Sequence, residues 1–296
     1  MNRLTLAFGA GFALLVGAAC TDSEAPGPDD DTMTSADNPF LTPSTLDLEY
    51  PRFDRIEVGH YMPAFERGME EQLGEVASIT GSDDAPTFDN TFVALERSGR
   101  LLARVSNVFF AMTSAHTNDD LRALETEIAP LLSAHSDQIL LDPVLFGRVS
   151  AVYEARDELD LDPEAHRLVE ETYKDFVRAG AQLDEAEKTR LREINAELAR
   201  LSTTFSQNVL AEVNDVAIVV DDESELAGLT PAQIQTAADA AAEREMAGRY
   251  VLPLLNTSQQ PAMASLENRA LRQRILETSL SRGQRGNEYD NRGVLT

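Results

Sequence analysis

Residues 184–209 read DEAEKTRLREINAELARLSTTFSQNV, and this stretch predicts a long amphipathic helix. Asp184, with Glu187 three positions later, has the form of a capping box at the helix start. The apolar side chains behind the box recur at intervals of three and four residues, as in a heptad-like seam: Leu191, Ile194, Leu198, Leu201, Phe205 and Val209. A seam of this kind predicts a long antiparallel partner helix.

Apolar residues recur at helical spacing upstream of this stretch as well, from Tyr61 onward. We expect one helix from Tyr61 to a loop at 81–86, a second over about 89–114 and a third over about 119–139. Two Asp-Pro pairs place an acceptor side chain before a proline, which suits a helix start: Asp142-Pro143 and Asp162-Pro163. Each pair is therefore expected to open a further helix.

The pattern changes downstream of residue 215. Two short apolar runs, 216–220 and 250–255, predict a small two-strand element, and Pro253 confines the second strand to a sheet edge. Between the runs, an alanine-rich helix is expected to stop at Gly248, and helix resumes after Pro261. The expected fold class is mainly α, a multi-helix protein with one small two-strand β element.

The chain has 296 residues and a formal net charge of -26, because 51 Asp and Glu outnumber 25 Lys and Arg. This balance lacks the electrostatic footprint of a nucleic-acid binder, so no nucleic-acid partner is expected. A hydrophobic content of 43% suits a folded domain. The single cysteine, Cys20, excludes an intrachain disulfide framework and a thiolate zinc cluster.

Residues 1–20 have the form of a bacterial lipoprotein signal peptide. Arg3 precedes a short apolar run of small residues that ends at Cys20, which would be lipidated and become the new N-terminus. Gly17 departs from the Leu usual in such signals, and the alternative is an ordinary signal peptide with an incidental cysteine. We expect a lipid-anchored, periplasm-facing location in the bacterial cell envelope, with the membrane as a partner through Cys20; the alternative is a secreted or periplasmic soluble protein.

Residues 21–37 are expected to form an acidic disordered tether. Acidic residues and prolines are frequent from 21 to 49, and no basic residue occurs there. Such a composition buries too little apolar surface to offset chain entropy. The folded region is therefore expected to span 38–296.

The histidines give little support for a metal site. The closest two in sequence, His116 and His135, are 19 positions apart, so no two share a helical turn and His-Glu-x-x-His is absent. The remaining two are His60 and His166. His166 lies four residues before Glu170, a spacing more typical of a solvated ion pair than of a metal site. His135 lies on the apolar side of its helix and is expected in the core.

Other catalytic patterns are also missing from the sequence. No Gly-x-Ser-x-Gly elbow or phosphate-binding glycine loop occurs. The acidic pairs Glu70-Glu71, Glu170-Glu171 and Asp221-Asp222 are more typical of exposed faces than of a glycosidase dyad. Residue chemistry alone therefore assigns no catalytic and no metal-binding residue to this chain.

Longer segments carry a family pattern, and they are distributed in order along the chain: NPFLTPS at 38–44, YMPAFERGM at 61–69, PTFDNT at 86–91, ALERSG at 94–99, DFVRAGA at 175–181, LLNTSQQP at 254–261 and SRG at 281–283. Together they resemble the opening part of bacterial peptidyl-dipeptidases, in the thimet oligopeptidase family of zinc metallopeptidases. The resemblance covers residues 38 to about 292.

The resemblance implies a mainly helical clam whose two halves enclose a deep channel for short, unfolded peptides. It covers roughly the first two-fifths of such enzymes, so their His-Glu-x-x-His and the other zinc and transition-state residues would lie beyond Thr296. One zinc ion is implied in full-length relatives and none in this chain. The expected function is the N-terminal, channel-wall part of a peptidase that releases C-terminal dipeptides, inactive alone because the zinc half is absent.

The implied partners are short peptides, once the channel is completed, and the missing C-terminal half in cis or in trans. Residues 38–296 would then be incomplete at the C-terminus, as in a truncated or frameshifted reading frame. Half of an interlocked helical protein is also expected to expose apolar surface. The alternative is a non-catalytic, lipid-anchored peptide-binding or scaffold protein.

Overall fold

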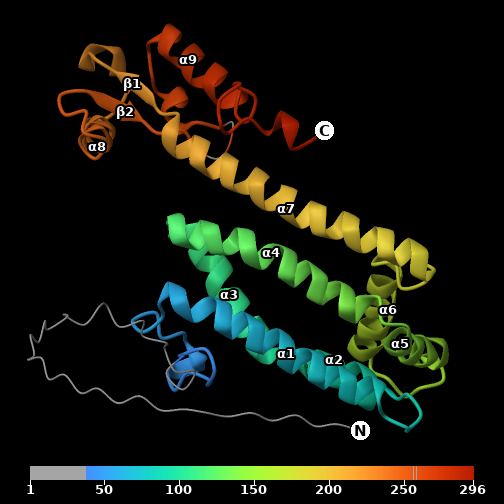
Figure 1. Cartoon of the computed structure of the whole chain (residues 1–296). Coiled ribbons are helices and arrows are strands. Elements are labelled where there is room, and N and C mark those ends of the chain that lie inside the picture. The colour runs from blue at the N-terminus through green and yellow to red at the C-terminus, as the bar shows by residue number, and fades with distance from the viewer. Residues whose placement is uncertain (1–37, 256, 258) are drawn as a thin grey trace, which may run out of the picture. The chain divides into compact units, whose positions relative to one another are not determined.

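The computed structural model describes residues 38–255, 257 and 259–296 (Figure 1). The expected signal peptide and tether, residues 1–37 with Cys20, lie outside the described residues. The described part is mainly helical and carries one antiparallel pair of short strands, so the expected fold class is confirmed. Within the same part, no helix combines the length and hydropathy needed to cross a membrane.

The helices between residues 61 and 215 follow one another through short connections: α1 (Tyr61–Thr80), α2 (Ala94–Arg97), α3 (Arg100–Ala115), α4 (Asp119–Leu140), α5 (Pro143–Ala155), α6 (Pro163–Arg178) and α7 (Glu185–Asp215). α1 packs against α3, α5 against α6 and α4 against α7 (Figure 1). The predicted helix starts are confirmed, because the side chains of Asp142, Asp162 and Asp184 each accept a hydrogen bond from the backbone N–H three residues later. Glu187 completes the capping box of α7.

The prediction of one continuous helix over 89–114 is wrong. A π-helical turn, Phe88–Val93, and the short α2 come first, and the chain then breaks before α3. Gly99 adopts a left-handed conformation with φ of 69°, and its backbone N–H donates to Glu75 Oε2 on α1 at 2.7 Å. The break is therefore fixed by a contact from another helix, together with a backbone conformation that glycine adopts without strain.

Two hydrophobic cores hold these helices together. The first lies between α1, α3 and the start of α4, where Phe40, Phe65 and Phe109 are buried. The second lies between the end of α1, α5 and α6, and includes Leu145 and Phe176. None of the α7 side chains that the structure describes is among the buried residues of either core, so this long helix is held mainly by other contacts.

A third core lies in the C-terminal part, among β1 (Ile218–Val220), α8 (Pro231–Ala242), β2 (Tyr250–Leu252) and α9 (Arg269–Leu280). The two strands pair antiparallel, with Ile218 opposite Leu252 and Val220 opposite Tyr250. The predicted two-strand element is confirmed, although both strands are shorter than the apolar runs. Pro253 follows β2 directly and cannot donate a ladder hydrogen bond, which accounts for the end of the second strand.

The end of α8 differs from the prediction. Its last turn closes in a Schellman motif, in which the N–H of Met246 bonds to the carbonyl of Ala241 and the N–H of Glu245 bonds to that of Ala242. Glu245, with φ of 59°, occupies the left-handed position, so the helix stops before Gly248. After Pro261 the chain forms only a 3₁₀ turn, Pro261–Ala264, before α9.

Candidate functional site

α4 is the antiparallel partner of α7. Hydrogen bonds from α7 reach α4 and its C-cap in reverse order along the sequence: Lys188 Nζ to the Leu141 carbonyl (3.1 Å), Asn195 Nδ2 to Asp137 Oδ1 (2.7 Å) and Gln207 Nε2 to the Arg122 carbonyl (2.9 Å). The two helices lie side by side in Figure 1. The predicted antiparallel partner is therefore confirmed.

The contact between α7 and α4 is polar, and the apolar seam is not at its centre. We call Leu191, Ile194, Leu198, Leu201, Phe205 and Val209 the α7 seam. At about 3.6 residues per turn, the seam lies roughly a quarter-turn from the face that carries Lys188 and Asn195. Ile194, Leu198 and Phe205 are exposed, and Leu198 is 53% exposed. The idea that the seam itself binds the partner helix is therefore wrong.

Part of the seam is covered by residues 281–296, which we call the C-terminal arm. Near the end of α7, the carboxylate of Glu212 accepts hydrogen bonds from the backbone N–H of Gly283 and from the guanidinium of Arg285. Glu212 is 1% exposed, and it lies seven residues after Phe205 on the same helix face. A buried ion pair thus anchors the beginning of the arm.

The arm then continues toward the middle of α7. Asn208 Nδ2 donates to Asn291 Oδ1 at 2.9 Å, and Asn291 Nδ2 donates to the backbone carbonyl of Phe205 at 3.2 Å. Farther along, Val294 and Leu295 line an apolar cavity of about 280 Å³ together with side chains of the α7 seam and its neighbours: Leu198, Leu201, Ser202, Phe205 and Ser206. Leu295 itself is exposed. The arm therefore covers only the C-terminal half of the seam.

Charged side chains border the uncovered half of the seam. Arg190 pairs with Glu193 at 2.7 Å, and Arg200 pairs with Glu197 at 2.6 Å. All four are well exposed, and each pair closes within α7. The uncovered surface is therefore an apolar strip with satisfied charges beside it. Such a strip is typical of a surface that a second element covers.

The histidines lie in separate places. His135 is buried, as expected, and its Nε2 contacts Gln72 Oε1 at 2.7 Å while Nδ1 has no partner. Burial lowers the pKa of His135. His60 is also buried, and its Nδ1 accepts a hydrogen bond from the Glu57 backbone N–H. His116 is exposed at the end of α3.

The expected ion pair between His166 and Glu170 is wrong. His166 Nε2 instead lies 3.1 Å from Asp157 Oδ1. Glu170 lies 3.4 Å from Arg167 and 3.8 Å from Lys174, on the same helix. Two cations that are neighbours of Glu170 on α6 thus compete with the histidine for this carboxylate.

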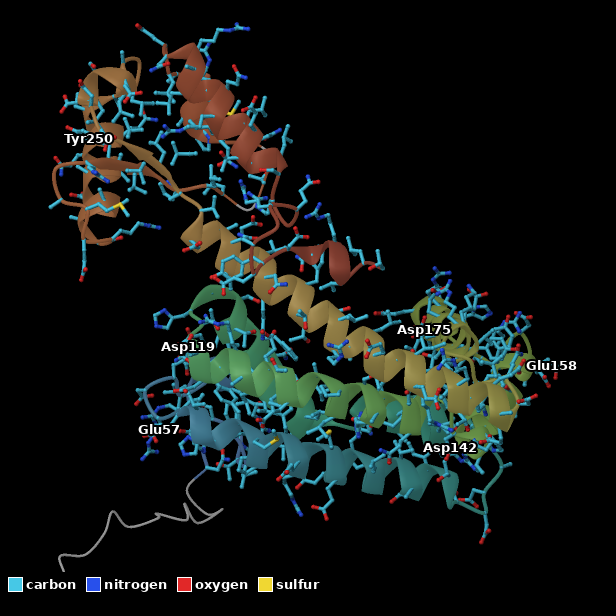
Figure 2. All side chains as sticks on the ribbon, turned by 45° about the horizontal axis from the view of Figure 1, so that its top comes forward. Glu57, Asp119, Asp142, Glu158, Asp175 and Tyr250 are labelled. Atoms are coloured by element: carbon cyan, nitrogen blue, oxygen red, sulfur yellow. The ribbon has the colours of Figure 1, made fainter. Side chains whose placement is uncertain are left out.

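The acidic residues do not gather into one site. Glu70 and Glu71 are exposed and pair with Arg67, and Asp221 and Asp222 are also exposed. The expectation of exposed faces holds for these two pairs, whereas the third pair, 170–171, is half-buried among ion pairs. Figure 2 shows other acidic residues at separate places along the chain, two on helices and three in connections: Asp119 and Asp175, and Glu57, Asp142 and Glu158.

The described residues do not fit a zinc site. In residues 38–255, 257 and 259–296, no group of three or more His, Cys, Asp or Glu side chains could hold a metal ion. The four histidines are committed to different surroundings, as described above. No catalytic step through zinc is therefore derived from these residues, and Cys20, the one predicted modification site, lies outside the described part.

No protein-family model matches this chain. It is 45% identical over 258 residues to the dipeptidyl carboxypeptidase of Salmonella typhimurium and 43% identical over 258 residues to that of Escherichia coli. Each match covers 87% of this chain and 38% of the relative. The chain is a homologue of the dipeptidyl carboxypeptidases. The resemblance inferred from the short segments is thereby confirmed.

More distant relatives point to the same group of peptidases. Oligopeptidase A of Haemophilus influenzae is 27% identical over 265 residues, which is 88% of this chain and 38% of the relative. This dipeptidyl carboxypeptidase homologue spans about 38% of the length of the two dipeptidyl carboxypeptidases that it matches. The peptidase interpretation is favoured over the non-catalytic scaffold.

Two buried charges on α7, Lys188 and Glu212, were not predicted as structural residues. Glu212 continues the spacing of the seam, seven positions after Phe205, so a charge at an apolar position was a detectable signal. Lys188 donates to the carbonyl of Leu141 at the C-cap of α4, where a cation also suits the helix dipole. This contact of Lys188 depends on a different helix, so no residue near Lys188 in the sequence indicates it.

Proposed function

We propose that this chain is the N-terminal, channel-wall part of a zinc peptidase of the dipeptidyl carboxypeptidase type. The whole enzyme would release dipeptides from the C-termini of short peptides, and this part would be inactive alone. The observation that carries the proposal is the 45% identity maintained over 87% of the chain, against a relative of which it spans 38%. The zinc ligands would belong to the part of the relatives outside that match.

The surface of α7 supports the requirement for a further part. Three side chains of the α7 seam are exposed, and Leu295 is exposed beside the cavity, next to a C-terminal arm that covers only half of the seam. Apolar surface left in this way is costly in water, and covering it is favourable by about 25 cal/mol for each Å² removed from solvent. A remainder that docks here would both stabilise the chain and complete a peptide channel.

The test is peptidase activity of the purified chain without its signal segment. A short peptide with a blocked N-terminus would be incubated with this chain, and with the full-length Salmonella dipeptidyl carboxypeptidase as the positive control. We expect no dipeptide release and no stoichiometric zinc from this chain. Turnover together with one bound zinc per chain would contradict the proposal, and His166 would then be the first residue to substitute.

The location of the protein is part of the same proposal. Lipidation of Cys20 would anchor the chain to a membrane of the bacterial cell envelope, with the acidic segment 21–37 as a tether to the folded part in the periplasm. The basis is the sequence of residues 1–20 alone. Metabolic labelling with a fatty-acid precursor tests it: we expect label in the unaltered chain and none in Cys20→Ser, whereas label in neither chain would favour the soluble alternative.

A further inference from the structure

We propose that the uncovered half of the α7 seam is a docking track for an amphipathic helix that continues the path of the C-terminal arm. The half in question consists of the exposed Ile194 and Leu198, and Leu191 at its N-terminal end is half-buried. The occupant is supplied by the portion of the peptidase that this chain does not span, in cis or in trans. The inference rests on the proposed function for the source of that helix, and on the geometry of α7 for its position.

The path of the C-terminal arm along α7 indicates where a continuing helix would lie. Contacts to α7 move steadily toward its N-terminus as the arm proceeds: Gly283 and Arg285 contact Glu212, Asn291 contacts Asn208 and the Phe205 carbonyl, and Val294 and Leu295 lie with Leu198 in one cavity. The arm therefore runs antiparallel to α7 along the seam. The next exposed seam position in this direction is Ile194, which is not among the residues that line this cavity.

Near its end the arm forms a short 3₁₀ turn, Asn291–Gly293, with the cap of a helix start. Asp290 Oδ1 accepts a hydrogen bond from the Arg292 backbone N–H at 3.0 Å, as a capping aspartate does. The N–H of Leu295 bonds to the carbonyl of Asn291 at 3.2 Å, which is the i to i-4 bond of an α-helix. The Arg292 guanidinium also holds the pKa of Asp290 well below its usual range, so the cap stays charged.

The surface indicates which kind of helix fits. Ile194 and Leu198 are exposed and four residues apart, so they present one apolar stripe to a partner helix. The charges beside the stripe are paired within α7, Arg190 with Glu193 and Arg200 with Glu197, and leave little net charge to attract a polar partner. The occupant should therefore carry apolar residues at intervals of three and four, as in other helix-in-groove recognition.

The test measures binding of a defined probe to the purified full chain. The probe is a labelled peptide of about 20 residues, roughly the length of a 30 Å helix, with the sequence that directly follows the matched region in Salmonella dipeptidyl carboxypeptidase. Leu198→Asp removes an apolar contact from the seam. Val144→Asp is the matched control, because Val144 on α5 is 54% exposed against 53% for Leu198, and the first turn of a helix tolerates a carboxylate.

We expect saturable binding that Leu198→Asp weakens at least tenfold and Val144→Asp leaves unchanged. If Leu198→Asp does not fold, Leu198→Ala replaces it, with an expected weakening of about threefold to tenfold, because a single large apolar side chain is lost. No saturable binding, or equal weakening by both Asp variants, would overturn the proposal. A chain that dimerises through the seam and excludes the peptide would also overturn it, by assigning the strip to a second copy.

The outcome is independent of peptidase activity. Peptide bound at the seam without any dipeptide release by the completed pair would preserve the docking track and defeat the proposed function. Dipeptide release by the completed pair and peptide binding could instead both be unchanged by Leu198→Asp. This result would support the proposed function and contradict the docking track.

Discussion

Glu212 on α7 and Arg285 in the C-terminal arm form an ion pair in which the carboxylate is almost fully buried. The Arg285 side chain keeps 19% of its surface exposed, and its guanidinium also donates to the carbonyl of Thr278. The pair joins two segments that are far apart in sequence. It fixes the point from which the arm runs along the α7 seam.

Removing one partner of this pair should destabilise the chain. Glu212→Ala leaves Arg285 without its carboxylate and the Gly283 N–H without its acceptor, and breaking a buried pair costs about 3 kcal/mol. Urea unfolding should therefore show a lower free energy of unfolding by about that amount, and limited proteolysis should cut the arm faster.

Glu197→Ala is the control, because Glu197 and Arg200 are both 55% exposed, and loss of such a pair costs less than about 1 kcal/mol. Equal effects of the two substitutions would show that the arm is not anchored through Glu212.

Substitution by alanine should have opposite effects on stability at Gly99, in the break between α2 and α3, and at Gly147, inside α5. Gly99→Ala should destabilise the chain by about 1 to 2 kcal/mol, because the left-handed conformation is strained for alanine. The new Cβ would also lie 2.5 Å from Gln72 Nε2. Gly147→Ala, in the exposed middle of α5 with no atom within 4 Å of its new Cβ, should stabilise by about 0.5 to 1 kcal/mol. Thermal unfolding of both variants checks the sign of each change in stability. A Gly99→Ala chain more stable than the unaltered one would show that position 99 does not need a left-handed conformation.

The stability of the chain should fall in mild acid because of His135. Burial lowers the pKa of this imidazole in the folded chain, whereas the unfolded chain has the ordinary value of about 6.5. Below that pH the unfolded state binds more protons, so the contribution is complete above about 6.5 and decreases as the pH falls toward the folded pKa. The free energy of unfolding, measured by urea titration from pH 7 to pH 5, should decline.

His135→Gln should reduce the slope of that pH dependence, and His116→Gln, at an exposed helix end, should leave it unchanged. A slope that His135→Gln does not alter would mean that other groups cause the loss of stability.

Local signals made much of the fold predictable. The caps at Asp142, Asp162 and Asp184 bond to backbone groups three residues away, so the sequence contains both partners. The strand pair was predictable for the same reason. β-branched residues favour a strand at their own positions, and Pro253 ends the second strand because it has no backbone N–H to donate. The family could be inferred from longer segments, since their order is preserved.

Contacts between distant segments were not predictable in the same way. The break at Gly99 depends on Glu75 from α1. The separation of His166 from Glu170 has a local cause, because Arg167 and Lys174 lie three and four residues from Glu170 on α6, but spacing alone does not say which of these neighbours the carboxylate contacts. The α7 seam could be recognised from the spacing of its apolar residues. The spacing does not say whether α4 or the C-terminal arm lies on the seam. A polar helix contact took the place of the expected apolar one.

We expect this chain to become a peptidase only when the zinc-bearing remainder of such an enzyme is present. The most direct measurement is dipeptide release after co-expression of this chain with the portion of Salmonella dipeptidyl carboxypeptidase outside the matched region, beside each part alone. We expect dipeptide release by the pair, with one zinc bound per pair, and no release by either part alone. Release by this chain alone, or a stable pair with bound zinc and no release, would contradict this expectation.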